Sequence, residues 1–199
     1  MTYSVSEIFY SLQGEGVRAG TAAVFVRFAG CNLRCTREVD GFDCDTVHDQ
    51  SCRLTVQALV EKVKTVDRGP CRWVVFTGGE PGLQVDDELV RALKSEGYRL
   101  AIETNGTVDI PSGLDWVTVS PKPSAPRLVV RRANEVRFVL DESRVPHCVD
   151  EIDADHYTVS PVFDGDQFDP AALVWCVRYC LHDPRFRLSV QQHKFWGVQ

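Results

Sequence analysis

Three cysteines in the first quarter of the chain have the residue type and the spacing to hold a metal centre. Cys31, Cys35 and Cys44 form the pattern C-x3-C-x8-C in a loop that follows the apolar run 22–28. Thiolate sulfur is a soft ligand, which favours zinc or an iron–sulfur cluster. With His48 the three could close a Cys3His zinc site. A cubane cluster would instead leave one iron open to a ligand that the protein does not supply.

Polar motifs at the ends of later apolar runs indicate such a ligand. In FTGGEPGLQ the adjacent Gly78 and Gly79 permit close backbone approach, and Glu80 is a suitable acceptor for an ammonium group. IETNGT ends the next run, with Glu103, and SPK stands at the end of the one after that, with Ser120 and Lys122. Each motif alone is typical of a turn or a loop. Their succession after a cysteine loop favours one shared ligand site.

The apolar runs that carry these motifs are predicted to be β-strands, because they are rich in β-branched and aromatic residues. They cover residues 22–28, 72–76, 98–103, 115–120, 135–140, 156–161 and 186–191. Helical periodicity marks 54–66, 86–97 and 169–183, with Thr55 and Asp169 as N-caps and Gly97 just beyond a C-terminus. Strands that alternate with helices predict parallel βαβ units, whose ligands bind at the carboxyl ends of the strands.

Length and composition predict one globular α/β domain over residues 1–199. Hydrophobic residues make up 44% and charged residues 25% of the chain, as in soluble proteins. The net charge of −6 disfavours binding to a nucleic-acid backbone. No apolar run approaches the roughly 20 residues of a membrane helix, and the N-terminus lacks the pattern of a secretory signal. We expect a cytoplasmic protein with neither a nucleic-acid nor a membrane partner.

The other cysteines are expected to serve mostly as small apolar side chains. A disulfide framework is disfavoured because no secretory signal is visible. Cys71 precedes an apolar run, and Cys176 and Cys180 lie four apart on one helix face. Cys52 is an alternative third ligand for the metal centre, but only Cys44 is followed by Asp-Thr.

Motifs spread over nearly the whole chain carry a family resemblance. These are EIFYSLQGEG, FVRFAGCNLRC, CDT, TGGEP, ETNGT, SPK and SVQQHKF. Together they resemble the radical S-adenosylmethionine (SAM) enzymes and, within them, the 7-carboxy-7-deazaguanine synthase family. LQGEG, the threonine of CDT and the histidine near the C-terminus narrow the resemblance to that family. The implied fold is α/β, a partial (incomplete) radical-SAM-type barrel with parallel strands.

The resemblance also implies the cofactor sites. Cys31, Cys35 and Cys44 would hold a [4Fe–4S] cluster, and SAM would bind its open iron. Thr46 would contact a Mg²⁺ ion that also binds the substrate carboxylate. The residues that would line the SAM site are Asp43, Cys44, Asp45, Gly79, Glu80, Glu103, Ser120, Pro121, Lys122 and Ser160.

A pterin substrate is implied in the same way. Its site would comprise Leu12, Gln13, Gly14, Glu15, Arg27, Thr77, His193 and the terminal carboxylate of Gln199. In the run 22–28, Arg27 is predicted to share a face with Ala23 and Phe25, opposite the face of Val24, Val26 and Phe28. A guanidinium there is suited to a carboxylate, although the strand pattern alone also allows a solvated edge. Gln13 and Glu15 carry acceptors for the amino-pyrimidinone edge of a pterin.

The implied activity is that of a carbon–nitrogen lyase. Radical abstraction of hydrogen from 6-carboxy-5,6,7,8-tetrahydropterin would lead to ring contraction and loss of ammonia, giving 7-carboxy-7-deazaguanine for queuosine and deazapurine biosynthesis. The cluster and SAM would do the chemistry, with no further catalytic side chain. A flavodoxin-like or ferredoxin-like electron donor and a homodimer are also expected. The alternatives are another radical SAM enzyme, such as a glycyl-radical activase, and a Cys3His zinc-binding module.

Two departures from the family pattern stand out. Radical SAM enzymes usually have C-x3-C-x2-C, whereas TREVDGFD separates Cys35 from Cys44. Gly41 predicts that this insertion loops out, which leaves the adenine contact expected beside the third cysteine, at Asp43, in question. The segment SPVFDG stands where the family often has Gln-Pro, so Ser160 would make a shorter contact to SAM.

Overall fold

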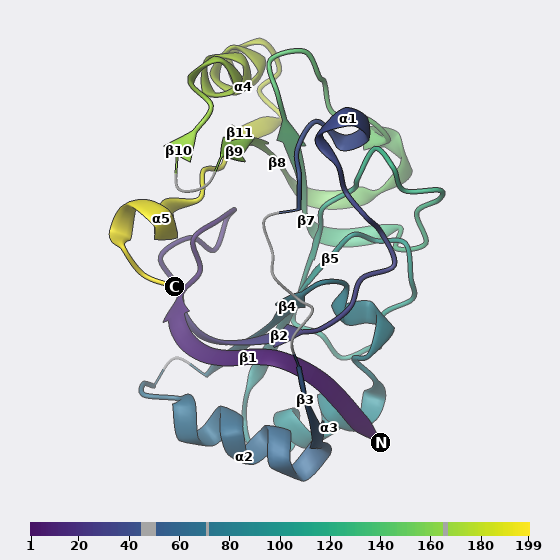
Figure 1. Ribbon diagram of the computed structural model, residues 1–199, viewed down its shortest axis with the longest axis vertical. Helices are drawn as coiled ribbons and strands as arrows, with labels where there is room; N and C mark the ends of the chain where they lie inside the picture. The colour runs from purple at the N-terminus through teal and green to yellow at the C-terminus, as the bar shows by residue number, and fades with distance from the viewer. Residues whose placement is uncertain (45–50, 71, 165–166) are drawn as a thin grey trace.

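The computed structural model describes residues 1–44, 51–70, 72–164 and 167–199. A curved nine-stranded sheet, in the order β11-β8-β7-β6-β5-β4-β2-β1-β3, forms its centre (Figure 1). The strands are β1 (Thr2–Leu12), β2 (Ala22–Phe28), β3 (Cys52–Thr55), β4 (Trp73–Gly78), β5 (Arg99–Thr104), β6 (Trp116–Val119), β7 (Arg132–Leu140), β8 (Asp153–Pro161) and β11 (Phe186–Leu188).

The strand directions agree with the predicted partial barrel. Every neighbouring pair from β11 to β2 is parallel, whereas β1 runs antiparallel to both β2 and β3. β11 and β3 stand at the two edges, so the described sheet is open. All seven predicted strands are present, and their carboxyl ends meet at one edge, as parallel pairing requires.

The three predicted helices are also present, as α2 (Val56–Val66), α3 (Asp87–Ser95) and α4 (Pro170–His182). The Thr55 side chain accepts a hydrogen bond from the Ala58 amide, and Asp169 caps α4 in the same way. Gly97, with a φ of 82°, follows the end of α3. None of the helices formed by the described residues is both long enough and apolar enough to span a membrane.

Side-chain alternation along the strands divides the core into an outer and an inner layer. In β2, Val24, Val26 and Phe28 pack in the outer layer with α2 and α3, whereas Ala23 and Phe25 pack on the inner face. Arg27 is the next residue of β2 on the inner face. Because of this alternation, its guanidinium points into the concave side of the sheet. The predicted division of this strand into two faces is confirmed.

Several short elements and one long strand lack a strong local pattern and were not predicted. β1 is the long one: polar and apolar side chains alternate in its first residues, as in a strand, but an irregularity between Val5 and Glu7 breaks this alternation. The short ones are α1 (Arg37–Asp40), α5 (Gln192–Trp196), β3, the hairpin of β9 (Phe163–Asp164) and β10 (Gln167–Phe168), and the 3-10 turns η1 (Pro81–Leu83) and η2 (Val149–Glu151). β1 and α5 both border the concave side of the sheet in Figure 1.

Candidate active site

A cavity of about 700 Å³ lies at the carboxyl ends of the parallel strands. The cysteine loop, the ends of β2, β4, β5 and β8, and the C-terminal residues contribute to its wall. All of the residues predicted to bind the substrate line it: Leu12, Gln13, Gly14, Glu15, Arg27, Thr77, His193 and Gln199. They come from three distant parts of the chain, which the fold brings together.

Most residues predicted for the cluster and for SAM line the same cavity. They are Cys31, Cys35, Asp43, Cys44, Gly79, Glu103, Ser120, Lys122 and Ser160. Glu80 and Pro121 are not part of this lining. Asp45, Thr46 and His48 lie outside the described residues. Cys52 is in β3, where its thiol donates to the carbonyl of Val5, and it does not line the cavity.

The three cysteines of the loop offer sulfur ligands to this cavity. Burial raises the pKa of the Cys31 thiol, and it raises that of Cys35 to about 11, against the opposing effect of the Lys122 ammonium. A metal centre must therefore displace protons when it binds. Among the described residues, no three His, Cys, Asp or Glu side chains are already gathered as a metal site. Three thiols on one wall can nevertheless ligate three irons of a [4Fe–4S] cluster and leave the fourth open to an outside ligand, so the residues fit it.

The insertion between the second and third cysteines folds into α1 and fastens the cysteine loop to the loop after β6. The buried carboxylate of Asp40 accepts hydrogen bonds from the amides of Thr36, at 3.0 Å, and Ser124, at 2.9 Å. Gly41 ends α1 with a φ of 87°, a left-handed conformation that glycine adopts without strain. Lys122 then lies 5.0 Å from the Phe42 ring centre. The insertion thereby becomes part of the cavity wall.

Glu80 connects two strand ends from behind the wall. Its carboxylate is fully buried and accepts hydrogen bonds from the Gly82 amide at 2.8 Å and from the Thr104 hydroxyl and Asn105 amide at 2.7 Å each. Burial raises the pKa of Glu80, and these three donors oppose the rise. Glu80 thus holds the TGGEP and ETNGT loops together.

The pterin side of the cavity combines β1, β2 and α5. The Arg27 Nε atom lies 3.4 Å from the carboxylate of Glu7 in β1, and its side chain is 25% exposed. Across the cavity, the Gln192 amide donates to the carbonyl of Gly14 at 2.9 Å. A Cβ atom at Gly14 would lie only 2.0 Å from Nδ1 of His193, so a side chain there would displace α5.

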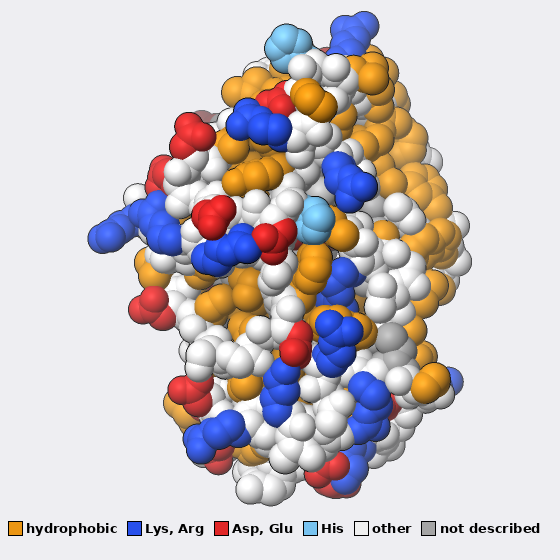
Figure 2. Space-filling model, turned by 180° about the vertical axis from the view of Figure 1, so that it is seen from behind, with side chains coloured by type: hydrophobic (Ala, Val, Ile, Leu, Met, Phe, Trp, Pro, Cys, Tyr) orange, Lys and Arg blue, Asp and Glu red, His pale blue; other side chains and the backbone are white. Residues whose placement is uncertain are grey.

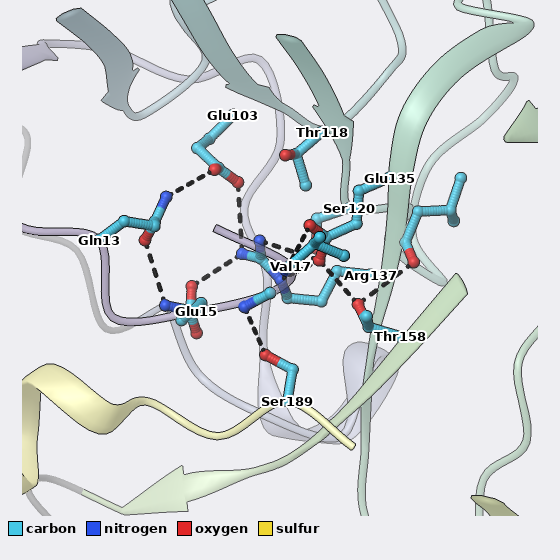
Figure 3. A network of polar contacts seen from close by, with 12 residues as sticks. Gln13, Glu15, Val17, Glu103, Thr118, Ser120, Glu135, Arg137, Thr158 and Ser189 are labelled. Atoms are coloured by element: carbon cyan, nitrogen blue, oxygen red, sulfur yellow. Dashed lines mark hydrogen bonds and ion pairs between the residues drawn. The ribbon is translucent and has the colours of Figure 1, made fainter. Parts of the chain in front are cut away.

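Arg137 is one of the cavity residues that sequence reasoning missed. It projects from β7, and its Nη1 atom lies 2.8 Å from Glu15 and 3.3 Å from Glu103 (Figure 3). Gln13 donates to the other oxygen of Glu103 at 3.0 Å. The signal in the sequence is EVRFVL, where Glu135 and Arg137 interrupt an apolar strand at alternate positions and therefore share its inner face.

Comparisons with known proteins bear on this cavity. The family model described as "4Fe-4S single cluster domain" matches residues 12–129. The 7-carboxy-7-deazaguanine synthase of Bordetella pertussis is 42% identical over 212 residues, and that of Bradyrhizobium diazoefficiens is 40% identical over 213 residues. In both cases the match covers 100% of each chain.

A solved structure is similar in fold. The crystal structure of QueE from Escherichia coli matches with a TM-score of 0.72 and 24% sequence identity. The match covers 97% of this chain and 95% of the other. The partial barrel is therefore an architecture that the two chains share over nearly their whole length.

Proposed function

This chain belongs to the 7-carboxy-7-deazaguanine synthase family, and from that membership we propose how its cavity serves the reaction. The enzyme is a radical SAM lyase that converts 6-carboxy-5,6,7,8-tetrahydropterin into 7-carboxy-7-deazaguanine with loss of ammonia, in queuosine and deazapurine biosynthesis. A bound [4Fe–4S] cluster and SAM supply the radical chemistry. The family membership sets aside the zinc module and the glycyl-radical activase.

One observation carries the assignment of the pterin site. Residues 12–15, Arg27, Thr77 and the C-terminal residues His193 and Gln199 all line one cavity. Arg27 binds the substrate carboxylate through its planar guanidinium. Gln13 and Glu15 accept hydrogen bonds from the amino-pyrimidinone edge, and His193 and Gln199 close the site from the opposite end of the chain.

The SAM site shares this cavity. Cys31, Cys35 and Cys44 hold the cluster, and the side chains of Glu103, Ser120 and Lys122 face SAM together with the backbone at Gly79 and the short side chain of Ser160. The hydrogen bond from Gln13 to Glu103 supports adjacent sites, because it joins a pterin residue to a SAM residue. Transfer of a hydrogen atom requires such contact between the two ligands. Asp43 and Asp45 complete the SAM site, and Thr46 binds Mg²⁺.

The surroundings of the enzyme are part of the same proposal. Residues 1–199 form one domain that works in the cytoplasm and receives electrons from a flavodoxin-like or ferredoxin-like protein. The protein is a homodimer. Support for the dimer comes from α4, on which the apolar side chains of Val174, Val177 and Leu181 are exposed.

Anaerobic reconstitution tests the proposal directly. The protein is loaded with iron and sulfide, reduced, and given SAM, Mg²⁺ and 6-carboxy-5,6,7,8-tetrahydropterin, and the products are followed by mass spectrometry. We expect 7-carboxy-7-deazaguanine to form without matching consumption of SAM, and to form more slowly when Mg²⁺ is left out. Cleavage of SAM with the pterin intact would contradict the substrate assignment.

A further inference from the structure

A buried network of charged side chains lies beneath the proposed pterin and SAM sites. It contains the carboxylates of Glu15, Glu103 and Glu135 and the guanidinium of Arg137 (Figure 3). Only 5% of the Arg137 side chain and 1% of the Glu135 side chain are exposed. Charges buried this deeply persist only when they are paired and hydrogen-bonded. The groups that pair with these charges therefore show which segments of the chain the network holds in place.

Glu135 forms the floor of this network and anchors the segment 13–20. It accepts hydrogen bonds from the Val17 amide at 3.0 Å and from the Thr158 hydroxyl at 2.9 Å. A Cβ atom at Gly16 would lie 2.2 Å from its Oε1 atom, so the backbone rests directly on the carboxylate. The Gly16 amide also donates to the Ser189 hydroxyl at 2.8 Å. The segment that presents Gln13 and Glu15 is thus fixed from below.

Arg137 connects this floor to the carboxylates above it. Its Nη2 atom lies 3.3 Å from Glu135, whereas Nη1 contacts both Glu15 and Glu103. A planar guanidinium can direct donors to three carboxylates at once, which a lysine ammonium on a flexible stem cannot do with the same geometry. One side chain thereby sets the relative position of a carboxylate in each of the two ligand sites.

We propose that Arg137 is a positioning residue of the reaction: it ties Glu15 of the pterin site to Glu103 of the SAM site and keeps both carboxylates available as hydrogen-bond acceptors. This proposal rests on the assignment of Glu15 and Glu103 made above. Arg137 takes no part in the chemistry. Its effect is to hold the two bound ligands at the separation that productive hydrogen transfer needs.

The charges that face Glu103 give the proposal a pH signature. They are Arg137 and Arg18, which lower its pKa, and Glu135 and Glu15, which raise it. Burial has the largest effect, and the pKa of Glu103 is raised to about 7. Without Arg137 it would rise further. Glu103 would then carry a proton at neutral pH and lose capacity as an acceptor.

Conservative variants test the proposal. Arg137→Lys keeps the charge and removes the fork of donors, and Arg132→Lys is the matched control, because Arg132 lies in the same strand but pairs with Asp155 at the surface. Binding of 6-carboxy-5,6,7,8-tetrahydropterin to the cluster-free chain is measured by calorimetry. Release of 5′-deoxyadenosine per product is measured on the reconstituted enzyme. We expect Arg137→Lys to weaken pterin binding and to increase this uncoupled release, each by about tenfold.

Arg137→Gln tests how ligand affinity depends on pH. The affinity of its reconstituted form for SAM is expected to fall, as the pH is lowered, at a pH about one unit higher than that of the wild type, because the cation beside Glu103 of the SAM site is gone. The proposal is overturned if Arg137→Lys binds pterin and couples SAM cleavage as Arg132→Lys does, or if the pH dependence of Arg137→Gln is unshifted. Failure of the wild-type chain to bind pterin would instead contradict the assignment of the site itself.

Discussion

Glu80 follows β4 and Glu103 lies near the carboxyl end of the neighbouring β5, yet the barrel gives the two side chains different surroundings. Glu80 is enclosed by donors from its own and the next loop, so its carboxylate is used in joining loops. Glu103 lines the cavity and is held by Gln13 and Arg137. A glutamate at the carboxyl end of a strand can therefore either hold the loops of the cavity wall together or face the ligand. The number of donors already pointing at it separates the two cases.

The titration of Glu103 predicts a pH-dependent stability. Its pKa is raised from 4.5 to about 7 in the folded protein, so the folded state binds a proton more tightly than the unfolded state does. The free energy of unfolding of the wild type should therefore fall, relative to that of Glu103→Gln, as the pH rises from 4.5 to about 7. Urea unfolding of the cluster-free chains across this range measures it. Parallel stability curves for the two proteins would contradict the prediction.

Arg27 carries the prediction for substrate recognition. Arg27→Gln removes the cation that pairs with the pterin carboxylate, an interaction of about 1.5–3 kcal/mol. We expect the KM for the pterin to rise at least about tenfold, while kcat changes less. Steady-state kinetics of the reconstituted enzyme provide the measurement, with Arg53→Gln, an exposed change in β3, as the control. An unchanged KM in Arg27→Gln would place the substrate carboxylate elsewhere.

At the scale of secondary-structure elements, the insertion between Cys35 and Cys44, which contains α1, has a structural role. Arg144 donates to the carbonyl of Val39 at 2.8 Å, and Asp40 fastens the insertion to the amide of Ser124. Through these contacts a segment that lengthens the cysteine motif is tied to the loops after β6 and β7. The longer spacing therefore need not loosen the cluster site, because tertiary contacts replace the short covalent connection.

Asp40→Ala tests this function of the insertion. The variant leaves two backbone donors unpaired in a partly buried position, at a cost of about 1–3 kcal/mol. The cysteine loop should then hold the cluster less well, with the iron content after reconstitution falling to about half or less. Glu38→Ala, an exposed change in the same helix, is the control. Equal iron content in the two variants would show that α1 does not order the cluster loop.

At the scale of the whole molecule, hydrophobic side chains are unevenly distributed over the surface. They gather along the right-hand edge of Figure 2, which corresponds to the left-hand side of Figure 1 because the view is turned by 180°, and α4 lies at the top of that side. Val174, Val177 and Leu181 contribute from α4, and Leu188 is exposed in the edge strand β11. An apolar helix face beside an open strand edge is typical of a surface that a second protein chain covers.

The proposed homodimer predicts the effect of charge on this face. The double variant Val177→Glu/Leu181→Glu should shift the protein from dimer to a monomer of 22.3 kDa, because burying two carboxylates in an apolar contact is unfavourable. Light scattering after size-exclusion chromatography measures the mass. Lys62→Glu, on the exposed side of α2, should leave the dimer intact. A wild-type chain that is already monomeric at micromolar concentration would contradict the proposal.

The sequence by itself determined the features that depend on neighbours along the chain. Alternation in 22–28 assigned the two faces of β2 correctly, and the caps of α2 and α4 lie at Thr55 and Asp169 as predicted. The cysteine spacing and the polar motifs after each strand indicated one shared edge. These patterns are readable because periodicity and capping involve residues only a few positions apart.

Only the tertiary structure decided which side chains meet across elements. Three features join residues that are distant in the chain: the antiparallel pairing of β1, the hydrogen bond between Asp40 and the loop after β6, and the hydrogen bond that Glu80 accepts from Asn105. The same holds for Arg137, which meets Glu15 across 122 positions. Such contacts depend on strand register and on the curvature of the sheet. A local pattern can specify the face on which a charge lies, but the fold selects its partner.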